Sequence, residues 1–184
     1  MGAEGSEKTA FSPDWTISQL AKLPYDTYAP EERATLQSLL RALTRFGSMH
    51  RGAEMRLSIG HDDCHAQNFI WADTAIWAID IEECRLQPTA KMIGNFLGWY
   101  AMHSPCVPSP LASAPSFGAE PGDLAALCAA VPLRPGETEI TLPFFLISRQ
   151  FECLFPAPKT PARRQENIAR AKILLHDLCK LMHL

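Results

Sequence analysis

Apolar residues recur at helical spacing over several long segments of the chain. Leu36, Leu39, Leu40 and Leu43 fall on one face of a helix, and Pro30-Glu31-Glu32 precedes them. Acidic side chains favour the positive end of the helix dipole, so this start is typical of a helix over about residues 30–50. Similar patterns predict further helices near residues 12–23, 88–100, 122–131, 138–155 and 161–183. The first of these has Ser12 as its expected N-cap and Pro13 at its first position.

Short extended runs interrupt the helical pattern in the middle of the chain. Residues 57–59 form one such run, and residues 69–71 and 75–81 form two more around a short polar turn, which predicts a β-hairpin. The last run places Asp80 at a strand end. Residues 104–122 are rich in proline and predict a surface loop. We therefore expect an α+β fold, mainly α, as one domain over residues 12–184, after a flexible N-terminus at residues 1–11.

Composition narrows the class of protein. The 184 residues suit a single domain, and 47% hydrophobic with 20% charged residues indicate a globular chain. A formal net charge of −3 gives no basic surface for nucleic acid. No apolar run reaches the roughly 18 residues of a membrane span, and the polar start has no signal-peptide core. Six cysteines without a Cys-x-x-Cys pair favour reduced thiols in a cytoplasmic protein.

Oxygen-bearing side chains follow the extended runs in a pattern that suits phosphoryl transfer. Asp63 lies in the loop before the hairpin, Asn68 follows five residues later, and Asp80 follows the hairpin. Transfer from a magnesium nucleotide requires a group that orients the attacking hydroxyl, together with hard oxygen ligands for the metal. We expect His61 to fix the loop through the backbone, and His65 to be structural or to touch phosphate.

The segment His61-Asp62-Asp63-Cys64-His65-Ala66-Gln67-Asn68, followed by Ile79-Asp80-Ile81-Glu82, resembles the catalytic region of the aminoglycoside phosphotransferase/choline kinase superfamily. This resemblance implies the C-terminal lobe of a protein-kinase-like fold and an ATP-dependent kinase that acts on an alcohol group of a small molecule. Asp63 would be the catalytic aspartate, and Asn68 and Asp80 would bind Mg²⁺. Ile70 and Ile79 would form the floor beneath the adenine of ATP, and Glu82 would assist the metal or bind a cationic substrate.

The chain also departs from this family. Members carry an N-terminal lobe of strands with a phosphate-covering loop and a lysine, whereas the roughly 56 residues before the catalytic segment read as helices. Lys22 falls in one of those expected helices, and Lys91-Met92 stands where members usually place a bracing aspartate. The resemblance therefore covers the C-terminal lobe only, and a missing N-terminal lobe is a possible partner.

Alternative interpretations stay open. A kinase-like C-terminal lobe that lacks the N-terminal lobe over the nucleotide could be a non-catalytic interaction module. His61-Asp62, together with His50 and a distant aspartate, faintly resembles the metal-binding dyad of HD-type phosphohydrolases, although such dyads lie on helices. Trp71 and Trp77 are expected in the core, and Trp99 and Tyr100 suit helix packing more than a choline-binding cage. Neither the acids of an aminoglycoside site nor the aromatics of a choline site gather clearly after residue 100, so the acceptor stays open.

Overall fold

The computed structural model shows a mainly helical α+β fold. The described residues are 8–61, 63–72, 75–80, 82, 84–103, 122, 125–126, 129, 133–134, 136–155 and 160–182, without the side chains of Ala66 and Trp71. The α-helices are α1 (Asp14–Leu20), α2 (Pro30–Met49), α3 (Thr89–His103), α5 (Leu142–Cys153) and α6 (Pro161–Leu181). The strands are β1 (Lys8–Ala10), β2 (Glu54–His61), β3 (Phe69–Ala72), β4 (Ala75–Ala78) and β5 (Cys84–Pro88). Short turns of helix are η1 (Tyr25–Thr27), η2 (Ala66–Asn68) and the π-helical η4 (Glu137–Thr141).

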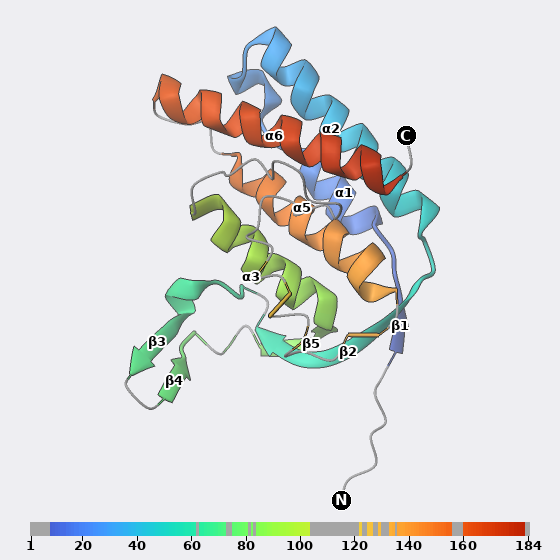
Figure 1. The fold of residues 1–184 in the computed structure, drawn as a ribbon, viewed down its shortest axis with the longest axis vertical. Coiled ribbons are helices and arrows are strands. Elements are labelled where there is room, and N and C mark those ends of the chain that lie inside the picture. The colour runs from blue at the N-terminus through green and yellow to red at the C-terminus, as the bar shows by residue number, and fades with distance from the viewer. Residues whose placement is uncertain are drawn as a thin grey trace, which may run out of the picture.

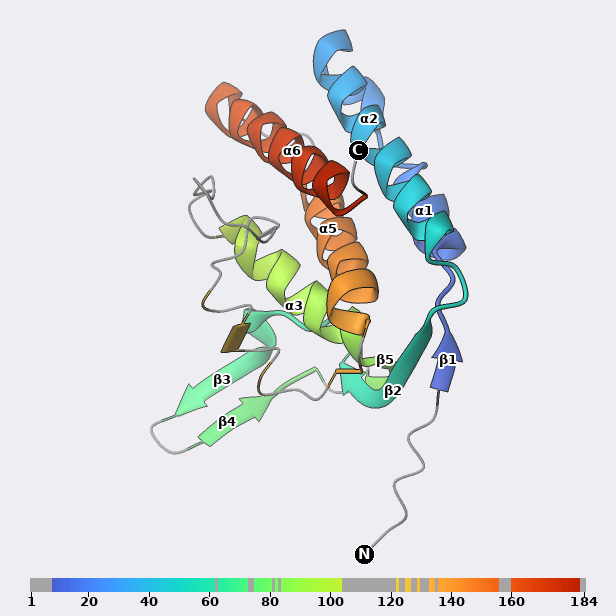
Figure 2. The same ribbon diagram turned by 45° about the vertical axis from the view of Figure 1, so that its right-hand side comes forward.

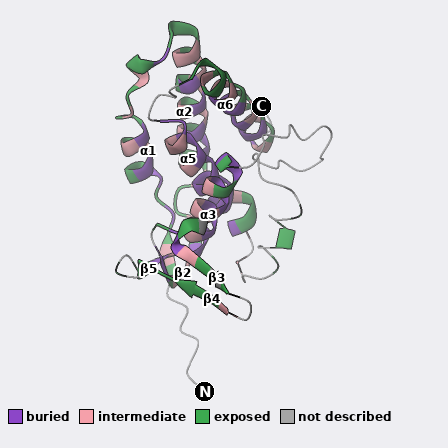
Figure 3. Ribbon diagram, turned by 90° about the vertical axis from the view of Figure 1, so that its left-hand side faces the viewer, coloured by how far each residue is buried: buried purple, intermediate pink, exposed green. Residues whose placement is uncertain are grey.

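The helices and the sheets occupy different ends of the molecule. Helices α2 and α6 lie at one end, α3 and α5 lie in the middle, and β1, β2 and β5 lie at the other end (Figures 1 and 2). The hairpin of β3 and β4 projects to one side of the sheet in both views. Buried residues concentrate where the helices face one another, whereas the hairpin is mostly exposed (Figure 3). The described helices are all too short or too polar to cross a membrane.

Helix α2 confirms the prediction made from its leucine pattern. It begins at Pro30, and the Glu32 carboxylate accepts a hydrogen bond of 2.8 Å from the Ala29 backbone N–H at the helix start. Leu36, Leu39 and Leu43 are fully buried. The apolar face that the sequence indicates is therefore the face that joins the core.

Helices α3 and α5 pack at backbone contact. A β-carbon added at Gly94 would lie 2.8 Å from the Leu146 backbone nitrogen, and one added at Gly98 would lie 2.8 Å from the Leu146 carbonyl oxygen. The two glycines are one turn apart on α3, so they form a smooth strip against which α5 lies. This close approach holds the N-terminal half of α3 and the middle of α5 beside each other, and both elements contribute to the candidate site.

The three-stranded sheet has the order β1-β2-β5 and is antiparallel throughout. It corrects the expected flexible N-terminus at residues 1–11, because Lys8–Ala10 form β1 and Phe11 is fully buried against Phe144. The expected run at residues 57–59 is longer than predicted, since β2 spans Glu54–His61. Strand β5 was not predicted. Its residues alternate between apolar and polar, but the polar Gln87 is buried and the apolar Leu86 is exposed, and the pairing with β2 defines the strand.

Element boundaries differ from the predictions at several other points. Helix α1 begins at Asp14, and the Ser12 hydroxyl donates to the Asp14 carboxylate instead of capping the helix. Pro88 ends β5, so α3 begins one residue later than expected. Strand β4 ends at Ala78, two residues before Asp80, and Ile81 lies outside the described residues. The predicted loop at 104–122 and helix at 122–131 also lie mostly outside the described residues.

Candidate functional site

The loop that carries Asp63 connects the three-stranded sheet to the hairpin. Strand β2 ends at His61, Asp63 lies in the following turn, and η2 then leads into β3. About half of the Asp63 side chain is exposed. The carboxylate is therefore accessible while both flanking segments are held in sheets.

Three hydrogen bonds fix this loop against the end of the hairpin. The Asn68 side-chain amide donates to the Asp63 carbonyl at 3.0 Å. The Ile79 N–H donates to the Asn68 carbonyl at 3.0 Å, and His61 Nε2 lies 3.2 Å from the Ile79 carbonyl. His61 and Asn68 are both buried, so these contacts are shielded from water. His61 therefore contacts the backbone of Ile79, and its role in fixing the loop stays a prediction.

The Asp63 carboxylate has two side-chain neighbours. Its Oδ1 lies 3.1 Å from Nη2 of Arg149 on α5, and its Oδ2 lies 3.2 Å from His65 Nε2. A carboxylate offers about four lone-pair directions, so these contacts orient both oxygens and still leave room for a further donor. Arg149 also lies 3.3 Å from a Glu152 oxygen, and it bridges the two acids.

Trp99 lies between two histidine rings. The His65 and Trp99 rings stack at 5.3 Å, and the Trp99 and His103 rings stack at 3.9 Å. Both ring pairs are nearly parallel, with interplanar angles of 23° and 25°. The stack holds His65 beside Asp63, so Trp99 links the Asp63 loop to His103 at the end of α3.

The remaining predicted site residues lie around the hairpin. Asp80 adopts a left-handed backbone conformation with φ of 61°, which is unusual for a residue other than glycine, and its side chain is exposed, as is that of Glu82. Ile70 and Ile79 are 53% and 41% exposed. Among the described residues, hydrogen bonds thus join His61, Asp63, Asn68 and the Ile79 backbone, and they do not include the side chains of Asp80 or Glu82.

The prediction that Trp77 lies in the core is wrong, because 64% of the surface of this residue is exposed. It pairs across the hairpin with Ile70, and the two side chains lie on the same face. The alternation of residues in β4 indicated a strand correctly, but the hairpin has no layer covering this face among the described residues. The side chain of Trp71 lies outside the described residues.

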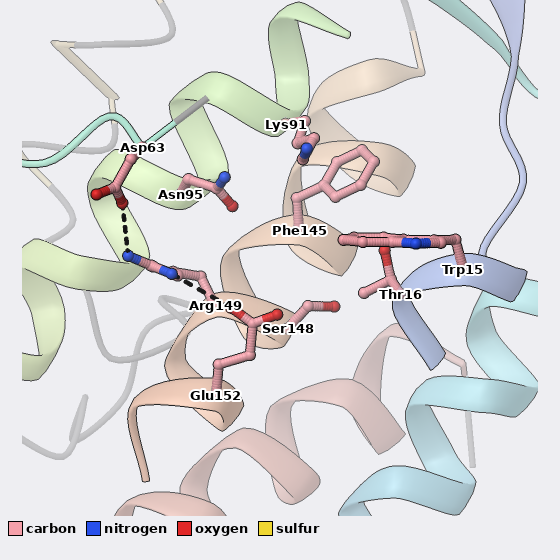
Figure 4. Close-up of a pocket in the computed structure, with 9 residues that line it drawn as sticks. All are labelled: Trp15, Thr16, Asp63, Lys91, Asn95, Phe145, Ser148, Arg149 and Glu152. Atoms are coloured by element: carbon pink, nitrogen blue, oxygen red, sulfur yellow. Dashed lines mark hydrogen bonds and ion pairs between the residues drawn. The ribbon is translucent and has the colours of Figure 1, made fainter. Parts of the chain in front are cut away.

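A cavity of about 200 Å³ opens beside Asp63. Figure 4 shows that side chains from α1, α3, α5 and the Asp63 loop point toward one space. The residues that line it are Trp15, Thr16, Asp63, Lys91, Asn95, Phe145, Ser148, Arg149 and Glu152. The candidate catalytic carboxylate therefore lies in the wall of a cavity large enough for a small molecule.

Charges are balanced around this cavity. Among the described residues that line it, Asp63 and Glu152 are acidic and Lys91 and Arg149 are basic. Burial raises the pKa of the Glu152 carboxyl above its ordinary value, and the nearby charges of Arg149 and Lys91 oppose this shift only in part. Burial, together with the Asp63 charge, also raises the pKa of the Cys64 thiol to about 11, which keeps this neighbour of Asp63 protonated and unreactive.

Sequence reasoning missed most of the cavity. Arg149 and Glu152 follow the apolar segment Leu142-Pro143-Phe144-Phe145-Leu146-Ile147 on the same helix, and charged residues in a largely buried helix were a signal that could have been used. Nothing in the sequence around Trp15 indicates that its ring reaches the same space. Lys91, near the start of α3, also lines the cavity.

Asn68 and Asp80 are the two residues expected to bind Mg²⁺. Asn68 and Asp80 offer an amide oxygen and a carboxylate, which are the hard ligands that Mg²⁺ prefers. The bond from the Asn68 nitrogen to Asp63 fixes the amide and leaves its oxygen for another partner. Within the described part of the chain, no three His, Cys, Asp or Glu side chains gather closely enough to hold a metal by themselves.

The HD-type interpretation gains no support from the described residues. It requires its dyad on helices, whereas His61 ends strand β2. His50, the third residue of that hypothesis, follows the end of α2 and packs its ring against Phe46 at 4.7 Å. Asp62 lies outside the described residues.

Comparisons with known protein families, with curated proteins and with solved structures found no match to this chain.

Proposed function

We propose that this chain is the helical lobe of a small-molecule phosphotransferase of the aminoglycoside phosphotransferase/choline kinase type. The observation that supports it best is the position of Asp63. Its backbone is fixed by buried Asn68, and its carboxylate lies in the wall of a cavity beside Arg149 and His65. A rigid, accessible carboxylate next to a binding cavity can orient an acceptor hydroxyl for attack.

The reaction would transfer the γ-phosphoryl group of ATP to that hydroxyl. The acceptor oxygen forms a bond to the γ-phosphorus, and the bond from this phosphorus to the β,γ-bridging oxygen breaks, so ADP leaves with the electron pair. The hydroxyl proton passes to the Asp63 carboxylate. The guanidinium of Arg149, 3.1 Å from Asp63, keeps this carboxylate oriented and adds positive charge near the phosphoryl group.

Asn68 and Asp80 are the proposed ligands of Mg²⁺, which would neutralise charge on the phosphates of the nucleotide. Ile70 and Ile79 offer exposed aliphatic surface on the hairpin, as a floor beneath an adenine ring requires. The described residues before β2 form β1, α1, η1 and α2, and they supply no strand-rich nucleotide cover. A separate strand-rich lobe would complete the cover over the nucleotide, whereas the proposed Mg²⁺ ligands and the floor beneath the adenine belong to this chain, so nucleotide binding can be tested on it.

A non-catalytic interaction module is the second candidate. Two observations favour it: Arg149 and His65 already contact both oxygens of the Asp63 carboxylate, and the hairpin exposes Ile70, Ile76 and Trp77 to solvent. Ile70 and Trp77 pair on one face of the hairpin, and neighbouring exposed apolar side chains are typical of surfaces that bind another protein.

Nucleotide binding separates the two candidates. For a phosphotransferase lobe, Mg²⁺-ATP at about one hundred times its Kd should stabilise the fold by about 2.7 kcal/mol and raise the melting temperature accordingly. Asp80→Asn should reduce that rise, whereas Asp63→Asn should keep it and lose at least about 100-fold in phosphoryl transfer or ATP hydrolysis. Asp26→Asn, a change at an exposed carboxylate paired with Arg33, is the matched control and should behave as the unmodified chain.

Two results would contradict the phosphotransferase proposal. A melting temperature that does not respond to Mg²⁺-ATP would support the interaction module. Turnover that survives Asp63→Asn unchanged would remove Asp63 from the reaction.

A further inference from the structure

The cavity beside Asp63 has features that select among classes of acceptor. We infer that it binds a neutral polyhydroxylated molecule the size of a single sugar or cyclitol ring, with Trp15 and Glu152 as specificity-determining residues. This inference rests on the proposed phosphoryl-transfer function, because the acceptor hydroxyl would approach Asp63 from this cavity.

Size is the first argument. Sites for drug-sized ligands usually measure about 300–1,000 Å³, and this cavity of about 200 Å³ is smaller. One hydroxylated ring fills such a volume. A linked aminoglycoside of several rings would extend far beyond it.

Charge is the second argument. The described lining residues carry two acids and two bases, Asp63 and Glu152 against Lys91 and Arg149. Arg149 lies within 3.1 Å of Asp63 and 3.3 Å of Glu152, so both acids already have a cationic partner. A cationic acceptor would have to compete with this guanidinium, whereas a neutral acceptor leaves the ion pairs intact.

Hydrogen-bonding capacity is the third argument. The Ser148 hydroxyl donates to the Phe144 carbonyl at 2.7 Å, so the lone pairs of its oxygen are what it can offer a ligand. The two carboxylates also accept, while the side chains of Arg149 and Lys91 donate. Walls that both donate and accept suit hydroxyl groups, which do both. Quaternary ammonium groups can do neither.

The aromatic residue at the cavity edge is the fourth argument. The Lys91 ammonium lies 5.9 Å from the centre of the Trp15 ring, so the face of this ring that would attract a ligand cation is already used by a lysine. Trp15 is 64% exposed, which leaves further ring surface for the C–H face of a sugar ring. The site thus combines an aromatic platform with polar walls and no excess of negative charge.

Titrations with three small probes test this assignment on the full 184-residue chain without nucleotide. The probes are myo-inositol, choline and 2-deoxystreptamine, followed by ¹H–¹⁵N NMR, which reports the indole N–H of Trp15 separately. We expect myo-inositol to bind, and both cations to bind at least about tenfold more weakly, a difference of about 1.4 kcal/mol. Equal or tighter binding of either cation, or absence of myo-inositol binding at roughly 20 mM, would overturn the inference.

Two variants locate the binding. Trp15→Ala should weaken myo-inositol binding about tenfold, because stacking on the ring is lost. Trp77→Ala is the matched control, since this tryptophan is also 64% exposed but lies on the hairpin away from the cavity. Equal effects of the two changes would show that the ligand binds elsewhere.

Glu152→Gln separates a polyol site from a cation site. A glutamine still hydrogen-bonds to hydroxyls, so myo-inositol affinity should change by less than about threefold. If the cavity served cations, the same change would remove an acid and weaken choline binding about tenfold or more. Because these titrations contain no nucleotide, polyol binding without a response to Mg²⁺-ATP would reject the phosphotransferase proposal and keep the cavity assignment.

Discussion

Arg149 and Glu152 illustrate how single residues of this protein acquire their properties from neighbours. They lie one turn apart on α5, and the guanidinium of Arg149 reaches across to Asp63 on a loop that is 86 residues away in sequence. The Glu152 carboxyl is the acid of this group whose pKa burial raises. Its ionisation therefore opposes folding, even though its partner Arg149 reduces that effect.

The pH dependence of stability should reveal Glu152. Its pKa in the folded chain lies above its ordinary value of 4.5, so the folded state holds the proton more tightly than the unfolded state. The free energy of unfolding of the unmodified chain should consequently fall, relative to Glu152→Gln, as pH rises from 4.5 through the raised pKa. Urea unfolding between about pH 4 and 8 measures the difference between the two curves.

Glu139→Gln is the control for this measurement, because Glu139 is exposed on η4. If the Glu152→Gln curve differs from that of the unmodified chain no more than the Glu139→Gln curve does, the ionisation of Glu152 makes no difference to folding.

At the scale of elements, the contact between α3 and α5 decides where the cavity lies. Because Gly94 and Gly98 have no side chains, α3 approaches the backbone of α5 closely. Lys91 and Asn95 on α3 and Ser148 and Glu152 on α5 then line the same cavity. A wider separation of the helices would change the width of the cavity between them. The apolar side chains of α5 fix the same arrangement from the other side, since Leu146 and Ile147 are fully buried.

Gly94→Ala tests this contact. Alanine is usually about 1 kcal/mol better than glycine inside a helix, but here its methyl group would lie 2.8 Å from the Leu146 backbone nitrogen. We expect the clash to prevail and to lower the free energy of unfolding by about 1–3 kcal/mol in urea titrations. Gly122→Ala, where nothing lies within 4 Å of the added carbon, should be neutral or slightly stabilising. A stabilised Gly94→Ala variant would mean that the helices are not in backbone contact.

At the scale of the whole molecule, α6 ties the C-terminal part of the chain to its beginning. Arg164 near the start of α6 donates to the Glu32 carboxylate at 2.7 Å and to the Thr27 carbonyl at 2.9 Å. Its guanidinium also lies 5.2 Å from the centre of the Tyr28 ring. The Tyr28 hydroxyl in turn donates to the Leu154 carbonyl at 2.6 Å, so η1, α2, α5 and α6 meet in one place.

Arg164→Ala should therefore destabilise the whole chain. The charged hydrogen bonds and the ring contact together predict a loss of about 1–3 kcal/mol in the free energy of unfolding, measured by urea titration. Arg164→Lys should recover only part of it, because an ammonium lacks the planar guanidinium that makes these contacts together. Lys172→Ala, at an exposed position on the same helix, is the control. If both alanine variants lose the same small amount, the contacts of Arg164 contribute nothing specific.

The type and approximate position of several elements followed from the sequence with little help from the fold. Helix α2 and helix α6 have regular apolar spacing, and the hairpin has two extended runs around a turn, so local periodicity was enough to place them. The order of His61, Asp63 and Asn68 likewise marked the loop as the candidate site. These features depend on residues that are close together in the sequence, so a sequence pattern is enough to predict them.

Tertiary structure alone decided the rest. Lys8–Ala10 become a strand only because the edge of β2 offers hydrogen bonds, and Trp77 is exposed only because no described element covers its face of the hairpin. The cavity needs Trp15 from α1, Lys91 from α3 and Arg149 from α5 at one point. These contacts join residues far apart along the chain, and their geometry is set by how closely helices and sheets pack, which local spacing does not encode.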